Sequence, residues 1–129
     1  MINLKIKAVP KPRMTRADTW KKRPCVVNYW AYKDELNDKL KSIDIELKDE
    51  LFVEFYIKMP KSWSKKKKAE YLGERHQQKP DVDNLIKGVM DALFKEDSHV
   101  HTIYAKKTWA EESSITFISG KSGLIKYLS

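Results

Sequence analysis

The chain has 129 residues, and its 26 Lys and Arg against 18 Asp and Glu give a formal net charge of +8. The length favours one domain over residues 1–129, and the aromatic content of 11% excludes a disordered basic tail. The charge favours an anionic partner such as nucleic acid or an acidic membrane. The single cysteine, Cys25, excludes an internal disulfide and a cysteine-based zinc site, and it fits a reducing compartment.

Residues 1–9 alternate apolar and charged side chains without the apolar core of a signal peptide. No later stretch approaches the ~20 apolar residues of a membrane span. A protein of the membrane surface would carry a long basic amphipathic helix, which the sequence lacks. We therefore expect a cytoplasmic protein without a membrane partner.

In residues 2–8 the alternation predicts a half-buried strand, which Pro10 and Pro12 end. Residues 11–24 follow as a basic loop that includes Trp20, a combination suited to phosphate contacts and base stacking. Alternatively, Trp20 packs inward and the loop is an ordinary solvated surface. The candidate DNA contacts of this loop are Lys11, Arg13, Arg16, Lys21, Lys22 and Arg23.

Apolar residues at helical spacing predict a packing helix over residues 29–43, and residues 51–57 are the strongest strand signal of the chain. Ser62 to Ser64 can cap a short helix through Lys65 to Lys68, with Gly73 as its terminator. Each lysine alone fits a solvated face, but together they suggest a sequence-independent phosphate surface in which Lys65 and Lys66 are candidate DNA contacts. We expect residues 74–78 to form an exposed loop.

A helix with one apolar face is predicted to start after Pro80, with Asp81 as its N-cap, and to end at Leu93. Asp83, Lys87 and Asp91 follow one another along its polar face. In the simplest interpretation, the two first acids are helix-start devices favoured by the helix dipole. The three polar residues would then be i,i+4 ion pairs worth ~0.3–0.5 kcal/mol each.

Strands are predicted over residues 100–109 and 114–118, joined by a hairpin turn at residues 110–112. Residues 120–129 form a tail apolar enough to dock on the domain or on a second subunit. The order of elements predicts an α+β fold in which helices cover one or both faces of a small mixed sheet of about four strands.

If Asp81, Asp83 and Asp97 converge, their carboxylates are hard oxygen ligands that suit Mg²⁺ or Mn²⁺ rather than zinc. Metal ions held there would straddle a phosphodiester and activate a water molecule. Lys87 could then stabilise charge on the phosphate, and Asn84 could orient a carboxylate or a bound water. His99 and His101 share one face of a strand, and we interpret them as structural or surface residues rather than ligands.

The same stretch carries a recognisable pattern, in which an Asp-x-Asp-Asn-x-x-Lys core is followed by Asp-Ala-Leu and an acidic pair. Its residues are Lys79, Pro80, Asp81, Asp83, Asn84, Lys87, Asp91, Ala92, Leu93, Glu96, Asp97 and Val100. The pattern resembles the RusA family of Holliday-junction resolvases. The resemblance extends to the basic proline loop at residues 10–13 and to the lysine-rich residues 60–74, which look like the phage and prophage branch.

The resemblance implies a homodimeric, Mg²⁺-dependent endonuclease that cuts four-way DNA junctions by paired nicks and needs no small-molecule cofactor. It implies that Asp81, Asp83 and Asp97 bind metal and that Lys87 is catalytic, with Lys79 among the DNA contacts. Asp91 matches the pattern without being a ligand. Lys95 and Glu96 depart from the family pattern, which leaves Glu96 or Asp97 as the third ligand, and we favour Asp97. The alternative is a non-catalytic basic DNA-binding module of the same fold.

Overall fold

The computed structural model describes residues 2–13, 23–42 and 49–118. In these residues the elements are, in chain order, β1 (Ile2–Leu4), α1 (Pro24–Ser42), β2 (Glu50–Lys58), α2 (Lys65–Tyr71), α3 (Val82–Leu93), β3 (Thr102–Ala110) and β4 (Ser114–Ile118). The four strands form one mixed sheet in the order β1-β4-β2-β3. The predicted α+β fold with a small mixed sheet is therefore confirmed.

Strand β2 is central because its residues bury both faces of the sheet. Five consecutive residues, Leu51 to Phe55, are buried. Strand β3 pairs parallel to β2 on one side, and β4 pairs antiparallel to it on the other. A strand buried on both faces reads as a near-continuous apolar run, which explains why this strand gave the strongest sequence signal.

The predicted hairpin between the last two strands is wrong, because β2 lies between them. Residues 111–113 carry the chain past the end of β2, where Met59 donates its backbone N–H to the Ala110 carbonyl over 3.0 Å. Two strand spacings amount to ~9.6 Å, and four Cα steps reach ~13 Å, so a short connection can make this step. The apolar β2 thus lies between β4 and β3, whereas a hairpin would have paired β3 directly with β4.

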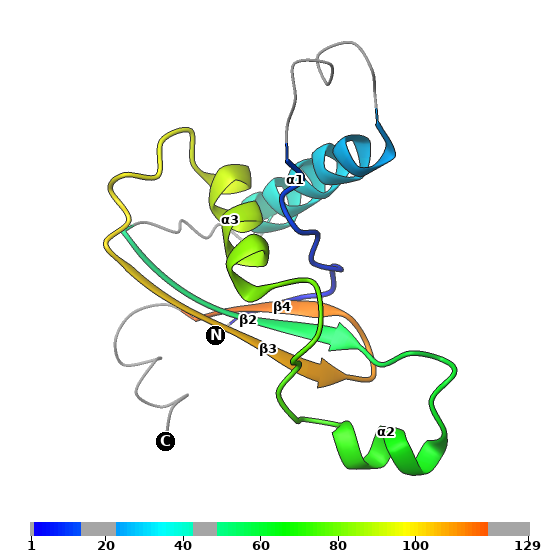
Figure 1. The fold of residues 1–129 in the computed structure, drawn as a ribbon. Coiled ribbons are helices and arrows are strands. Elements are labelled where there is room, and N and C mark those ends of the chain that lie inside the picture. Colours follow the sequence, from blue (N-terminus) through cyan, green and yellow to red (C-terminus); the bar gives the residue numbers. More distant parts are fainter. Residues whose placement is uncertain (1, 14–22, 43–48, 119–129) are drawn as a thin grey trace.

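Helices α1 and α3 lie together on one side of the sheet (Figure 1). Their apolar faces meet the side chains of β2 and β4 that point to the same side. This core contains Tyr29, Tyr32, Leu36, Leu40, Leu51, Val53, Phe55, Leu85, Ile86, Val89, Ile115 and Phe117. Helix α1 begins at Pro24, five residues before the predicted start, and its predicted last residue, Ile43, lies outside the described residues.

The first strand is shorter than predicted, because the chain leaves the sheet after Leu4 and packs against α3 instead. The backbone N–H of Lys11 donates to the Asn84 carbonyl over 3.3 Å. A Cβ atom on Gly88 would lie 2.9 Å from the carbonyl oxygen of Val9. Only glycine permits this approach, so Gly88 is where the N-terminal segment crosses α3.

Residues 74–78 form the predicted loop, exposed except at His76, and residues 73–76 in addition bond to the outer edge of β3. Gly73, with φ of +82°, donates to the Trp109 carbonyl over 3.0 Å, and Trp109 donates to the Glu74 carbonyl over 2.9 Å. His76 donates its backbone N–H to the backbone carbonyl of Lys107 over 3.0 Å, and the His76 side chain is buried. This pairing carries the chain from α2 along β3 to the start of α3.

Several expectations lie outside the described residues, namely those on Arg16, Trp20, Lys21, Lys22 and residues 120–129. Within the described ranges, none of the helices has the length and apolar character needed to cross a membrane.

Candidate active site

Asp81 and Asp83 line one surface pocket of about 630 Å³ at the start of α3. Both residues are exposed. The pocket is completed by Gln77, Gln78, Lys79, Val82 and Lys107. Two carboxylates and two lysines therefore share one solvent-accessible surface, and none of the lining residues is a histidine or cysteine.

Asp81 occupies the predicted N-cap position, but its carboxylate does not cap the helix. Its backbone is extended, with φ of −69° and ψ of 146°, and its side chain makes no capping hydrogen bond. The helix starts instead through the backbone carbonyl of Asp81, which accepts the N–H of Leu85 over 3.1 Å. The carboxylate is consequently left for other partners, in contrast to the simple capping role considered from sequence.

Lys107 is the site residue that the sequence reasoning missed. Its ammonium group donates to the backbone carbonyl of Gln78 over 2.6 Å and to that of Pro80 over 2.8 Å. Burial lowers the pKa of Lys107 below its usual value, and the charge of Asp81 acts in the opposite direction. Alternation along β3 was a usable signal, because Lys107 lies on the same face of the strand as Ala105 and the buried Trp109.

The polar face of α3 does not carry the continuous ion pairing considered from sequence. Asp91 pairs instead with Lys11, whose Nζ lies 3.0 Å from its carboxylate. Among the described residues, no ion pair joins Asp83 to Lys87, and Lys87 is exposed without lining the pocket. Asn84 is also exposed, and its contribution in the structure is the backbone carbonyl that holds Lys11.

Asp97 lies beyond the other end of α3 and does not line the pocket. Helix α3 has 12 residues, a length of ~18 Å. The Glu96 carboxylate accepts the Ser98 backbone N–H over 3.3 Å, so it serves the turn itself. Within the described part of the chain, no three His, Cys, Asp or Glu residues are grouped so that they could hold a metal ion. The role of Asp97 as a ligand stays a prediction.

Both histidines of this region have partners of their own. His99 lies 2.9 Å from an Asp49 carboxylate oxygen and packs edge-on against Phe94, at 4.9 Å between ring centroids. His101 lies 2.8 Å from the hydroxyl of its neighbour Thr102. These contacts agree with the structural interpretation of the two residues.

Among the described residues, the candidate DNA contacts are exposed, with the exception of Lys11. Lys65 and Lys66 are exposed on α2, and Lys79 is exposed at the acidic pocket. Arg13 is exposed as well, and its carbonyl accepts a hydrogen bond of 2.8 Å from the guanidinium of Arg23. Lys11 differs from these, because it pairs with Asp91 and its Nζ lies 5.2 Å from the ring centroid of Tyr29.

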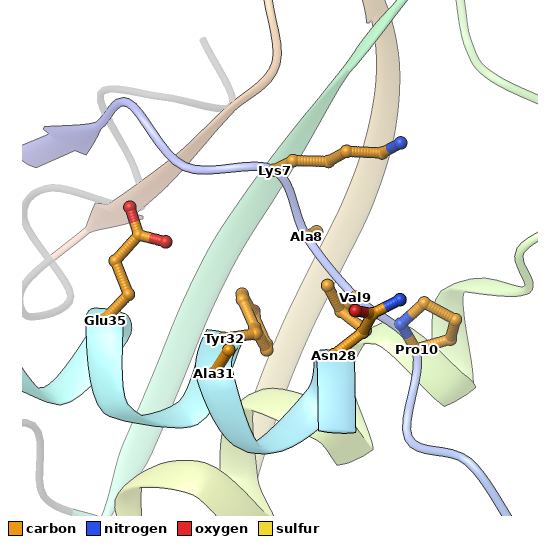
Figure 2. Close-up of a pocket in the computed structure, with 8 residues that line it drawn as sticks. All are labelled: Lys7, Ala8, Val9, Pro10, Asn28, Ala31, Tyr32 and Glu35. Carbon is orange, nitrogen blue, oxygen red and sulfur yellow. The ribbon is translucent and has the colours of Figure 1, made fainter. Parts of the chain in front are cut away.

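A second cavity, of about 470 Å³, lies between the N-terminal segment and α1 (Figure 2). Lys7, Ala8, Val9 and Pro10 form one side of it, and Asn28, Ala31, Tyr32 and Glu35 of α1 form the other. The hydroxyl of Tyr32 is buried without a hydrogen-bond partner among the described residues. The cavity has a single carboxylate and shares no lining residue with the acidic pocket, so it is not part of the candidate site.

Together, these features define a small α+β domain with a paired-carboxylate pocket in a basic chain. A sequence profile described as Endodeoxyribonuclease RusA matches residues 4–118. The chain therefore belongs to the RusA endodeoxyribonuclease family, as the sequence pattern had predicted.

A relative from Bacillus subtilis (strain 168), described as Uncharacterized protein YqaN, is 45% identical over 71 residues. The match covers 49% of this chain and 50% of the relative, so the chain spans about half the length of the curated relative it matches.

Proposed function

We propose that this protein is a Mg²⁺-dependent, structure-selective endodeoxyribonuclease that resolves four-way DNA junctions by paired symmetric nicks. The proposal rests chiefly on the pocket that Asp81 and Asp83 share with two lysines, in a member of the RusA family with a net charge of +8. A cytoplasmic location follows from a substrate that is cellular DNA.

The donor atoms of the pocket fit Mg²⁺, with Mn²⁺ as a substitute. Mg²⁺ in phosphoryl-transfer sites is commonly held by one or two carboxylates, with waters and substrate phosphates completing its shell. Asp81 and Asp83 provide two such carboxylates, both exposed. When bound, the metal would activate a water molecule and neutralise charge on the phosphodiester. Two carboxylates are therefore sufficient to bind Mg²⁺, and Asp97 is not needed in the same pocket for the metal to bind.

The cations of the chain would bind the phosphate backbone of DNA, which the two exposed carboxylates repel. Lys79 and Lys107 line the pocket beside them and oppose that repulsion. Lys87, one helical turn beyond Asp83, would stabilise charge on a phosphate bound at the pocket. The lysines of α2 supply sequence-independent phosphate contacts, which raise affinity and make it depend on salt.

We further propose a homodimer. Paired cuts on a two-fold symmetric junction require two active sites related by the same symmetry, and a two-fold dimer provides them. A monomer in sedimentation experiments that still makes paired cuts would contradict this part of the proposal.

The test is an end-labelled four-way junction incubated with Mg²⁺ and either the wild-type chain or Asp83→Asn. We expect nicked duplexes from the wild type, and binding without nicking from Asp83→Asn. Asp34→Asn, on the exposed surface of α1, is the matched control that removes one carboxylate elsewhere. A linear duplex of one junction arm reports structure selectivity. Nicking by Asp83→Asn at the wild-type rate would refute the proposal.

The second candidate is a non-catalytic DNA-binding module of the same fold. It is favoured by one observation, that the described residues contain no group of three metal-binding side chains. This candidate predicts junction binding that survives both Asp→Asn substitutions, with no nicking by the wild type under any divalent cation.

A further inference from the structure

We propose that Lys107 is a positioning residue, which places the Asp81 carboxylate for reaction by clamping the backbone that precedes it. This inference rests on the proposed nuclease function and adds a residue to it.

The clamp acts on two backbone carbonyls that precede Asp81 in the chain. The ammonium of Lys107 donates to Gln78 over 2.6 Å and to Pro80 over 2.8 Å. The Pro80 carbonyl belongs to the peptide group whose nitrogen is that of Asp81, and the proline ring already fixes its own φ. Holding that carbonyl consequently fixes the plane from which Asp81 projects.

Lys107 can perform this role because its own backbone is held from both sides. On one side β3 pairs with β2, with Lys107 opposite Phe55. On the other side its carbonyl accepts the backbone N–H of His76 over 3.0 Å. The ring of His76 packs on Trp109 at 4.2 Å between centroids. The side chain therefore extends from a hydrogen-bonded part of the sheet edge to the carbonyls of the exposed Gln78 and the half-buried Pro80.

Charge supports the same assignment. The Lys107 ammonium lines the pocket with Asp81 and Asp83, so it lies where an approaching phosphate and the two acids meet. A lysine ammonium has three donors and no acceptor, and two of the three are used by the carbonyls. The residue thus brings a fixed positive charge to the pocket while it holds the backbone.

The principal test is Lys107→Met, which keeps an unbranched side chain one atom shorter than lysine and removes its donors. We expect a folded protein that still binds the four-way junction, although more weakly than Lys33→Met, the control that removes one exposed positive charge from α1. Cleavage rates are therefore compared with the junction fully bound. Cleavage should fall by about 100-fold, the size of effect that an ångström-scale misplacement of a reacting group produces. Hydrogen exchange of the Leu85 amide, which donates to the Asp81 carbonyl, should become faster because the clamp is gone.

Chemical rescue separates a positioning role from general damage. In a Cys25→Ser background, which removes the exposed native thiol, Lys107→Cys should be as slow as Lys107→Met. Alkylation with bromoethylamine returns an ammonium group at nearly the original length. It should restore both the cleavage rate and the slow amide exchange. The same treatment of Cys25→Ser alone is the control for alkylation elsewhere.

Three results would overturn the inference. Cleavage by Lys107→Met at the rate of Lys33→Met would show that the clamp is unnecessary. Slow cleavage with unchanged exchange of the Leu85 amide would show that Lys107 does not position this segment. Failure of the alkylated variant to recover, while alkylated Cys25→Ser stays active, would show that the ammonium is not what matters.

Failure of the proposed function gives a different pattern, in which the wild type itself does not nick any junction. The exchange measurement then decides the clamp alone, and unchanged exchange in Lys107→Met rejects it.

Discussion

Gly88→Ala should destabilise the protein by about 1–3 kcal/mol, although the same change in an exposed helix stabilises by ~1 kcal/mol. The added methyl group would lie 2.9 Å from the Val9 carbonyl oxygen, 3.4 Å from the Lys11 backbone nitrogen and 3.5 Å from the Tyr29 ring. A comfortable C···O contact is ~3.3 Å or more, so the backbone of the N-terminal segment must retreat by roughly 0.4 Å. Backbone cannot rotate aside as the end of a flexible side chain can.

The costs and gains of the added methyl group determine whether Gly88→Ala lowers or raises the free energy of unfolding. Overpacking costs ~1–3 kcal/mol, and weakening of the two hydrogen bonds at this crossing, which contribute ~1 kcal/mol each, adds a loss of about 1 kcal/mol. These are the bond of 2.9 Å from the Tyr29 hydroxyl to the Gly88 carbonyl and that of 3.3 Å from Lys11 to Asn84. The gain in helix propensity offsets only ~1 kcal/mol of this cost.

The assay is urea denaturation, with thermal melting beside it. For a chain of this length a loss of 1 kcal/mol lowers Tm by roughly 4 °C, so we expect a decrease of about 4–12 °C. Lys87→Ala, one residue earlier on the exposed face, is the control and should stay within ~0.5 kcal/mol of wild type. If Gly88→Ala were as stable as wild type or more so, the close crossing of α3 by the N-terminal segment would be refuted.

Three further predictions concern buried polar groups. Tyr32→Phe should leave stability unchanged or raise it by up to ~1 kcal/mol in urea denaturation, because the hydroxyl it removes is buried without a partner among the described residues. Glu54→Gln should cost ~1.5–3 kcal/mol by the same assay, since the buried carboxylate accepts bonds of 2.6 Å from Thr108 and 2.9 Å from Tyr56, and an amide cannot accept both in the same way. Burial, and secondarily Lys107, lowers the pKa of His76 below 6.5. The unfolded chain therefore binds this proton more readily, so stability should fall as pH drops below about 6.5, and His76→Phe should reduce that dependence in urea midpoints measured across the range.

The elements with strong internal patterns were predictable from sequence. A run of branched and aromatic residues predicted strand β2. A one-sided apolar stripe that starts after Pro80 predicted α3. Both signals arise within one element, because each reflects the face that the element buries. The position of Asp81 and Asp83 at the helix start could be read from the same local pattern.

The wrong hairpin and the missed contacts of Lys107 have one cause, which is pairing between segments far apart in sequence. The two last strands looked like a hairpin because they are neighbours in the chain, yet β2 is inserted between them. Residues 74–78 form the predicted exposed loop except at His76, but nothing local indicated that this loop pairs with the edge of β3. Alternation along β3 indicates the face on which Lys107 lies, but its partners Gln78 and Pro80 can be assigned only when that edge pairing is known.

The topology also explains why the acids of the sequence pattern are divided between the two ends of α3. Strands β2 and β3 are parallel, so the chain must return from the carboxyl end of one to the amino end of the other, and α3 makes that return. The start of α3, with Asp81, therefore lies toward the carboxyl ends of these strands, where sites of parallel sheets commonly form. The segment after α3, with Asp97, leads into Thr102 at the amino end of β3. Lys107 is five residues further along that strand, a rise of ~17 Å, and so it meets Asp81 rather than Asp97.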